Sequence, residues 1–239
     1  GKLKKTPEDA GSGQFVWKTG SNELNGYNAA ELRRYREVFD FYLAKNNINV
    51  LNMLNAKYIV AQDEKGAAFP YENESANGNA WFVSTLEQVD SANEEIKALD
   101  SLDNKNKAVY RLPENIIEYQ TLRDNYVVDS LASINIVKHQ PNYLKYKSSN
   151  ANDGFAVFSE IYYPKGWKAT IDGREVSFKR VNYILRGMEI PAGAHVVEFR
   201  FDPDVVKTGS SIALGSSVLL AILILSGIFY EFKKRKQVA

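Results

Sequence analysis

An uncharged, apolar run near the carboxy terminus constrains this chain more than any other feature. Thr208–Tyr230 is a run of 23 residues without a charged side chain, and eleven of them are Ile, Leu, Val or Phe. About 20 such residues suffice for a helix to cross the ~30 Å hydrocarbon core of a bilayer, and the eleven apolar ones favour insertion by roughly 3 to 7 kcal/mol. A buried core helix is the alternative, but such helices are rarely apolar for so long. We therefore expect a transmembrane helix at 208–232, with Ser211–Phe232 as its membrane-spanning part.

The charges that flank this run predict its orientation. The sequence KKRK at 233–236 follows the run closely, whereas the fifteen residues before Thr208 contain only Arg200 and Lys207 as basic residues. Because basic residues are retained on the cytoplasmic side, the basic tail at 233–239 is expected in the cytoplasm. The preceding part of the chain is then extracytoplasmic.

The amino-terminal sequence does not explain how such a domain would be exported. The first fifteen residues, GKLKKTPEDAGSGQF, contain no apolar stretch of seven residues, so they resemble neither a signal peptide nor an earlier span. The chain also opens with glycine in place of an initiator methionine. We therefore expect it to be the carboxy-terminal piece of a longer membrane protein.

Composition indicates a folded ectodomain and excludes several classes of function. The chain is 44% hydrophobic and 25% charged, which is typical of a globular protein. Its net charge of +1 provides no basic field for nucleic acid. The absence of cysteine excludes a disulfide scaffold and thiolate metal ligands.

Residues 1–120 are predicted to form a mixed α+β extracytoplasmic lobe. Leu32, Tyr35, Phe39 and Tyr42 recur every three or four residues, which indicates an amphipathic helix that Asn28 is placed to cap. The other elements expected in this lobe are a short helix before a strand at 57–61, a non-periodic loop at 63–79, one strand within 78–89, a helix capped by Ser91 and a strand at 107–112.

Residues 121–206 are predicted to form an antiparallel β-sandwich. Short runs of β-branched and aromatic residues alternate with Pro, Gly and Asn at intervals typical of such folds. In the last run Val197 and Phe199 share one face, and Asp172-Gly173 has the composition of a two-residue hairpin turn with positive φ. The expected fold class is therefore α+β and β-rich: a mixed lobe, a sandwich and one transmembrane helix.

The sequence contains no recognisable catalytic constellation. His139 and His195 are the only histidines, and His195 is interpreted as a packing residue at a strand end rather than as a general base. The acid pairs at 63–64 and 94–95 are interpreted as solvated, because neighbours on a loop or on a polar helix face usually are. No catalytic residue, metal ligand or cofactor site is predicted.

Aromatic side chains are the remaining candidates for a binding site. Trp81, Tyr162, Tyr163, Trp167 and Tyr183 have flat surfaces that suit the apolar faces of sugar rings, although core packing is the preferred interpretation for the set. Trp81 lies at an expected entry from loop to strand, and Tyr163 precedes a proline at an expected strand end. These two residues are the predicted glycan contacts.

Three segments carry a resemblance to a known family. In order, and followed by a span with a basic flank, they are NVLNMLNAKYIV (Asn49–Val60), GNAWFV (Gly78–Val83) and FSEIYYPKGWKATIDGREV (Phe158–Val176). They resemble the carboxy-terminal region of the bacterial YfhO family of polytopic membrane proteins, and the resemblance covers nearly the whole chain. It implies a bacterial cell-membrane protein with about a dozen spans and a GT-C-like glycosyltransferase fold. Such proteins take sugars from polyprenyl-phosphate carriers, and their catalytic carboxylate lies in an early extracytoplasmic loop to which no residue here corresponds.

The resemblance and the residues together favour one function and leave alternatives. The favoured function is the extracytoplasmic domain and last span of a polyprenyl-phosphate-sugar-dependent glycosyltransferase, in which this domain positions a cell-envelope acceptor glycan. The partners are then the lipid bilayer and, through the parent protein, the lipid-linked sugar and the glycan. The alternatives are a non-catalytic glycan-binding module and a structural or partner-binding ectodomain.

Overall fold

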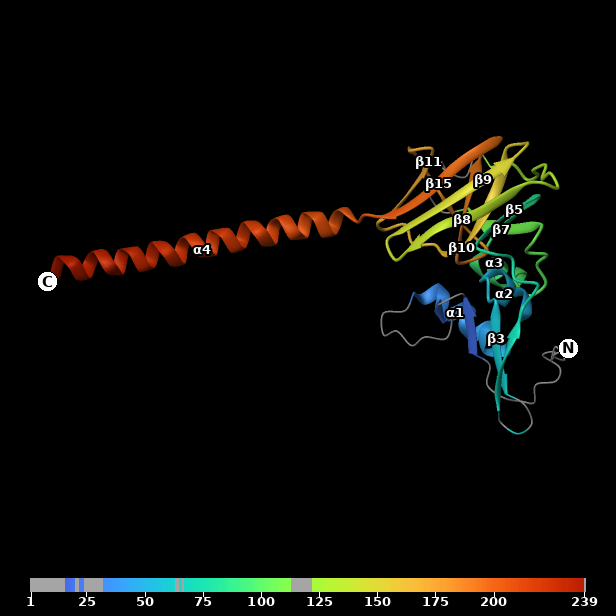
Figure 1. The fold of residues 1–239 in the computed structure, drawn as a ribbon, viewed down its shortest axis with the longest axis horizontal. Helices are drawn as coiled ribbons and strands as arrows, with labels where there is room; N and C mark the ends of the chain where they lie inside the picture. Colours follow the sequence, from blue (N-terminus) through green and yellow to red (C-terminus); the bar gives the residue numbers. More distant parts are fainter. Residues whose placement is uncertain are drawn as a thin grey trace.

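The computed structural model of the chain has a globular part from which one long helix, α4, projects (Figure 1). The structure describes residues 16–19, 22–23, 32–62, 65, 67–112 and 122–238. Within the described residues the globular part is rich in antiparallel strands and has three short α-helices on its amino-terminal side. The predicted fold class, α+β and strand-rich with one apolar carboxy-terminal helix, is confirmed.

The predicted sandwich consists of two antiparallel sheets packed face to face. Short strands with alternating apolar residues form it because each strand buries one face against the opposite sheet. The five-stranded sheet has the order β12 (Arg174–Val176), β11 (Trp167–Ile171), β15 (Gly193–Phe201), β9 (Tyr143–Asn150) and β8 (Ser133–Gln140). The four-stranded sheet has the order β13 (Lys179–Val181), β14 (Leu185–Ile190), β10 (Gly154–Ile161) and β5 (Ala80–Val83).

Three aromatic rings lie at the centre of the sandwich. Phe158 of β10 contacts Tyr146 of β9 and Phe199 of β15 edge to face, with ring centroids 5.0 and 4.9 Å apart. All three side chains are fully buried. Edge-to-face contacts add to the free energy of apolar burial, so this cluster holds the two sheets together.

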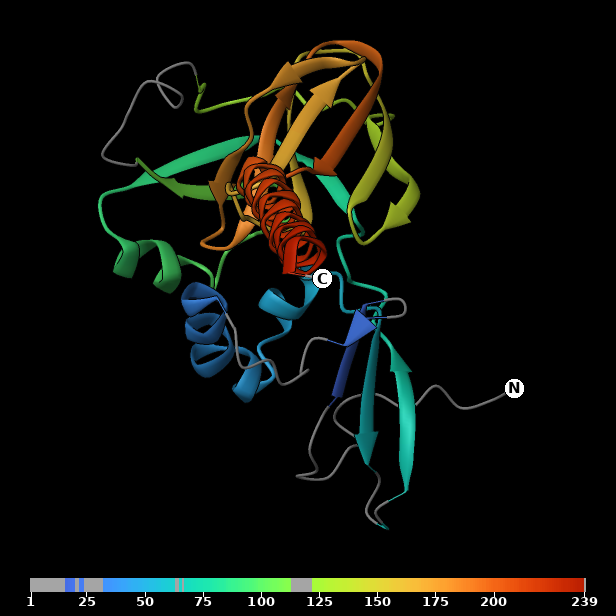
Figure 2. The same ribbon diagram turned by 90° about the vertical axis from the view of Figure 1, so that its left-hand side faces the viewer.

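The four-stranded sheet is also covered on its other face, so the globular part has three layers. Phe155 and Val157 of β10 point away from the sandwich core and are fully buried against the amino-terminal lobe. Three α-helices and one 3-10 helix supply that layer: α1 (Arg33–Phe41), η2 (Leu43–Lys45), α2 (Ile48–Met53) and α3 (Ala92–Ala98). Viewed along α4, the helices α1 and α2 lie beneath the sandwich (Figure 2).

Two smaller sheets belong to the lobe. One is antiparallel, with the order β2 (Asn22–Glu23), β1 (Val16–Thr19), β3 (Tyr58–Gln62) and β4 (Ala68–Glu72). The other is a parallel pair, β6 (Thr85–Val89) and β7 (Lys107–Arg111), whose connection contains α3. The strands predicted at 57–61 and 107–112 are thus present.

The single strand predicted within 78–89 is wrong, because the structure has two strands there in two different sheets. β5 pairs with β10 of the sandwich, whereas β6 pairs with β7. The break falls at Ser84, whose backbone N–H and hydroxyl both donate to the carbonyl of Asn106. The lobe and the sandwich consequently share one sheet.

Two local expectations in the lobe also differ from the structure. The amphipathic helix begins at Arg33, after Leu32 in extended backbone, and Asn28 lies outside the described residues. Part of the loop predicted at 63–79 is the strand β4, whose side chains are mostly exposed or half-buried. An edge strand of this kind has too little apolar alternation to be recognised in the sequence.

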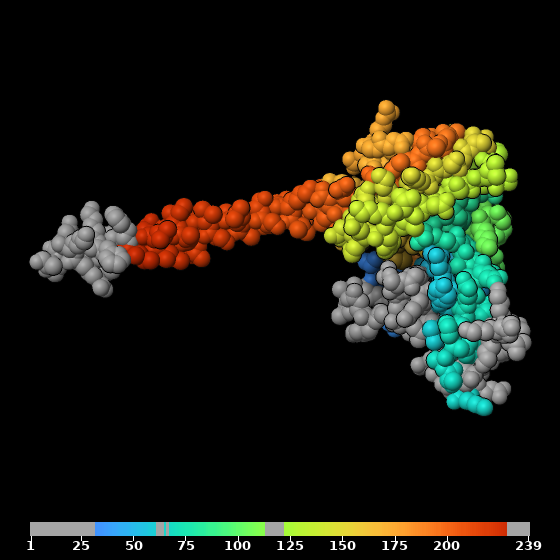
Figure 3. Space-filling model, in the orientation of Figure 1, coloured from blue at the N-terminus to red at the C-terminus, as the bar shows by residue number. Residues whose placement is uncertain are grey.

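The helix α4 (Asp204–Val238) contains the predicted span. Residues Asp204–Ile228 are long and apolar enough to cross a membrane: an 18-residue stretch within them has a mean hydropathy of 2.3, and none of that stretch is buried against the rest of the protein. At 1.5 Å per residue, 25 residues extend about 37 Å, enough for a ~30 Å hydrocarbon core. Figure 3 shows α4 as a bare rod, so the alternative of a buried core helix does not hold.

Candidate functional site

Tyr163 lies at the end of the sandwich from which α4 leaves. It belongs to the loop 162–166 between β10 and β11 and is half-buried. Gly166 of this loop accepts a hydrogen bond from the backbone N–H of Asp202, two residues before α4 begins. Tyr163 is therefore close to the point where the chain becomes apolar.

Trp81 occupies a different environment, in β5 against the core of the lobe. Its ring is half-buried, and its indole N–H donates to the backbone carbonyl of Asn104 at 2.7 Å. A sugar would have to contact the ring face, since the polar edge is already bonded. No contact among the described residues joins Trp81 to Tyr163, and a glycan contact at either residue stays a prediction.

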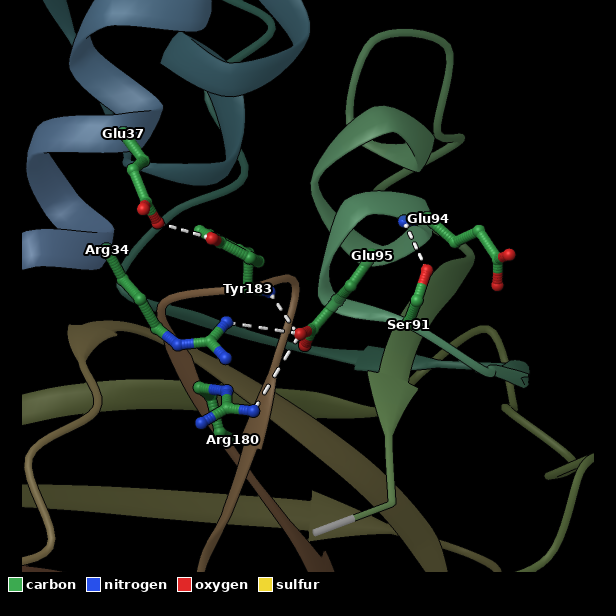
Figure 4. A network of polar contacts seen from close by, with 7 residues as sticks. All are labelled: Arg34, Glu37, Ser91, Glu94, Glu95, Arg180 and Tyr183. Carbon is green, nitrogen blue, oxygen red and sulfur yellow. Dashed lines mark hydrogen bonds and ion pairs between the residues drawn. The ribbon is translucent and has the colours of Figure 1, made fainter.

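A polar network joins α1, α3 and the turn between β13 and β14 (Figure 4). Glu95 of α3 is its centre: one carboxylate oxygen lies 3.3 Å from Arg34 Nη1 and 3.8 Å from Arg180 Nη2. The other oxygen accepts the backbone N–H of Tyr183 at 3.3 Å. The Tyr183 hydroxyl in turn donates to Glu37 of α1. The network therefore fixes α1 against α3 and against the sandwich.

The expectation that the 94–95 acid pair is solvated is wrong for Glu95. Its side chain is fully buried, whereas Glu94 is exposed and accepts the backbone N–H of Asp90 at the start of α3. Burial raises the pKa of Glu95 above its ordinary value, although Arg180 and Arg34 oppose the shift. The two arginines explain how a carboxylate reaches the interior, and neither is near it in the sequence.

This raised pKa predicts a pH dependence of stability. The carboxyl of Glu95 ionises at a lower pH in the unfolded chain than in the folded one. The protonated carboxyl therefore contributes fully to the free energy of unfolding below the unfolded pKa of about 4.3, and this contribution is lost as pH rises through the folded pKa. Glu95→Gln removes this loss, and we expect its free energy of unfolding to rise relative to wild type between pH 4 and 8. Urea unfolding in detergent micelles measures this, with Glu94→Gln as the control that parallels wild type. If the free energy of unfolding of Glu95→Gln instead fell relative to wild type over this pH range, the attraction of the two arginines would outweigh the effect of burial on Glu95.

A cleft of about 540 Å³ lies at the other end of the α1–α3 contact. Its lining consists of Phe41, Tyr42, Lys45, Asn47, Lys97 and Asp100. The Phe41 ring is 54% exposed, and the Asn47 side-chain amide donates to the Asp100 carboxylate at 2.8 Å. Its volume is in the range of small-ligand sites.

The cleft presents a flat apolar ring, an amide, a carboxylate and two ammonium groups. Lys45 and Lys97 form no ion pair with another described residue. Sequence analysis missed this site because its residues come from separate elements. The one available signal was Phe41, which is apolar but outside the stripe of the amphipathic helix.

Each histidine lies beside one carboxylate, His139 beside Glu160 and His195 beside Asp172. His195 is not a simple packing residue: its Nδ1 lies 2.6 Å from Asp172 Oδ2, and its Nε2 lies 3.1 Å from the carbonyl oxygen of Ala192. The contact connects the β11–β12 turn to the start of β15. The carboxylate of Asp172 also raises the pKa of His195. Among the described residues no group of three His, Cys, Asp or Glu side chains is placed to hold a metal ion.

Among the described residues one helix is long and apolar enough to cross a membrane, and a strand-rich domain directly precedes it. Comparison with known protein families gives a match: residues 96–213 match the model of the bacterial membrane protein YfhO, so this region is similar to that family. The matched region runs from α3 through the sandwich into α4 and includes Phe158–Val176. No curated protein and no solved structure matches the chain.

Proposed function

We propose that the chain is the extracytoplasmic domain and last span of a polytopic YfhO-family protein that resembles polyprenyl-phosphate-sugar-dependent glycosyltransferases. In this proposal the domain positions a cell-envelope acceptor glycan near a reaction centre elsewhere in the protein. Its contribution to catalysis is orientation, because holding an acceptor in place converts a bimolecular step into a nearly unimolecular one.

One observation carries this proposal: the sandwich is joined to the membrane helix by only two residues. β15 ends at Phe201 and α4 begins at Asp204 (Figure 1). So short a connection keeps the globular part at the surface of the bilayer. A lipid-linked sugar has its reactive end at the same surface, and a glycan held by this domain is therefore within reach of it.

The proposed side of the membrane follows from charge. The basic run 233–236 lies beyond the apolar segment of α4, and it favours the cytoplasm for that end. The sandwich and the lobe are then extracytoplasmic, where cell-envelope glycans are assembled.

The cleft between η2 and α3 is the proposed acceptor site. The exposed ring of Phe41 supplies a surface for a sugar face, and Asn47 and Asp100 supply partners for hydroxyl groups. The Glu95 network holds both walls of the cleft, so the site is formed before a ligand arrives. Trp81 and Tyr163 are proposed as further contacts along a longer glycan.

A transfer assay tests this function. Membranes containing the full-length protein are supplied with a polyprenyl-phosphate sugar and increasing acceptor. Phe41→Ala is expected to raise the KM for acceptor about tenfold with little change in kcat, since it removes roughly 1.4 kcal/mol of ground-state and transition-state binding alike. Tyr58→Ala, at an exposed aromatic residue of β3 outside the cleft, is the matched control and should behave as wild type.

The other outcomes distinguish the alternatives. An unchanged KM in Phe41→Ala, together with loss of transfer when residues 32–202 are deleted, would retain the domain's role but exclude the cleft. Unchanged transfer after that deletion would make the domain a structural or partner-binding ectodomain. Absence of transfer by the intact protein, with saturable sugar binding, would favour a non-catalytic glycan-binding module.

A further inference from the structure

The junction between the sandwich and α4 is built as a rigid unit. Gly166 has a φ of +115°, and a Cβ there would lie 2.8 Å from the Phe201 ring and 2.9 Å from Pro203 Cβ. The backbone N–H of Asp202 donates to the Gly166 carbonyl at 2.7 Å. A side chain at position 166 would thus separate the loop 162–166 from the start of the helix. We call this loop, together with Lys168 and residues 200–207, the junction.

Where α4 crosses a bilayer with its uncharged run in the hydrocarbon core, the junction lies at the depth of the lipid headgroups. The uncharged run starts at Thr208, four residues after the helix begins at Asp204, which is about 6 Å along the axis. The headgroup layer on each side of a bilayer is roughly 5–8 Å thick. Lys168 Nζ is 3.4 Å from the Asp204 carboxylate, which places the start of β11 at the same level.

The junction carries more positive than negative charge. Two of its ion pairs are internal: Lys207 with Asp202 at 2.5 Å, and Lys168 with Asp204. Lys165 and Arg200 are exposed and form no ion pair with any residue that the structure describes. Two cationic side chains at the junction are therefore outside any ion pair, although the charge of Arg200 also acts on the carboxylates of Glu198 and Asp202.

An aromatic ring supports one of these cations, and further aromatic residues lie at the junction. Arg200 stacks over the ring of Tyr143, with its guanidinium carbon 5.1 Å from the ring centroid, which leaves its outer edge free to donate hydrogen bonds. Trp167 packs on Phe201 at 5.4 Å, and Tyr163 precedes Pro164 in the loop. Tyr and Trp are enriched at the membrane–water interface because their rings are apolar at one end and polar at the other.

We propose that the junction binds the phosphate groups of anionic phospholipids, with Lys165 and Arg200 as the cations that contact them. The occupant is a lipid of the leaflet that α4 enters, because the helix brings these side chains to that surface and to no other. This binding fixes the tilt of the sandwich over the bilayer. It does not depend on sugar transfer and would hold in a YfhO-family protein with any activity.

The test measures lipid binding to the full chain in detergent micelles by native mass spectrometry. Phosphatidylglycerol is the anionic probe and phosphatidylcholine is the neutral one. The double variant Lys165→Gln/Arg200→Gln is expected to bind phosphatidylglycerol about 30-fold more weakly, roughly fivefold for each charge, with phosphatidylcholine binding unchanged. Lys165→Arg/Arg200→Lys should retain wild-type affinity.

The control removes the same charge elsewhere. Lys105→Gln/Lys147→Gln affects two exposed lysines, one in the turn before β7 and one in β9. An equal loss of binding in this control would show that only net charge matters, and would overturn the proposal. Unchanged binding in the junction variant would overturn it too, as would displacement of the lipid by equimolar glycerol 3-phosphate, which would indicate a site for soluble phosphate.

Discussion

Phe158→Ala is expected to lower the free energy of unfolding of the globular part by about 3–5 kcal/mol. The Phe158 side chain is fully buried between the two sheets and contacts the rings of Tyr146 and Phe199. Its removal leaves a cavity that neither ring can fill without losing its own edge-to-face contact, and each such contact contributes about 0.5–1.5 kcal/mol beyond burial. For a domain of this size the melting temperature should fall by roughly 6–20 °C.

Thermal unfolding followed by circular dichroism in detergent micelles measures this change. Phe41→Ala is the matched control, because it removes the same side chain from a position that is 54% exposed, and it should change stability by less than about 0.5 kcal/mol. The same control shows that the cleft variant used in the transfer assay is folded. A Phe158→Ala protein as stable as Phe41→Ala would mean that the two sheets do not depend on this cluster.

The strands of the sandwich were predictable because each carries its own local signal. The turn at Asp172-Gly173 shows this: both residues have positive φ, at 49° and 80°, as the residue pair indicated. In β15 the inward positions Val197 and Phe199 are fully buried, as their alternation with charged residues indicated. The apolar run of α4 is likewise a local signal. Its side chains are not buried against the rest of the protein, as the prediction of a membrane span requires.

The features that build the candidate sites depend on pairs of residues that are distant in the sequence. Glu95 is buried because Arg34 and Arg180 reach it from α1 and β13. The residues next to Glu95 in the sequence do not indicate either partner. The cationic junction is a similar case. Arg200 is visible in the sequence before the span, whereas Lys165 reaches the same place only through the bond between Asp202 and Gly166.

The junction and the cleft are connected by a continuous series of packed elements. The junction attaches β15 to the membrane helix, the Phe158 cluster attaches β15 to β10, and β10 continues through β5 into the lobe. The Glu95 network then fixes the helices that line the cleft. A change in the tilt of the sandwich at the bilayer would therefore move the cleft as part of the same body.

The proposed side of the membrane predicts an all-or-none labelling result. The 239-residue sequence contains no cysteine, so a single cysteine can be introduced here in a cysteine-free form of the full-length protein. Lys105→Cys lies in an exposed turn of the globular part, and Val238→Cys lies beyond the basic run 233–236. In intact spheroplasts an impermeant maleimide should label position 105 nearly completely and leave position 238 unlabelled, because basic residues are retained in the cytoplasm.

Permeabilised spheroplasts provide the control, since both cysteines should then react. Labelling of position 238 but not 105 in intact spheroplasts would place the sandwich in the cytoplasm. An acceptor glycan outside the cell could not then reach the cleft, and the lipids at the junction would be those of the inner leaflet. The labelling pattern therefore decides which leaflet supplies the phosphates for Lys165 and Arg200, whereas the lipid-binding measurement decides whether those side chains bind phosphates at all.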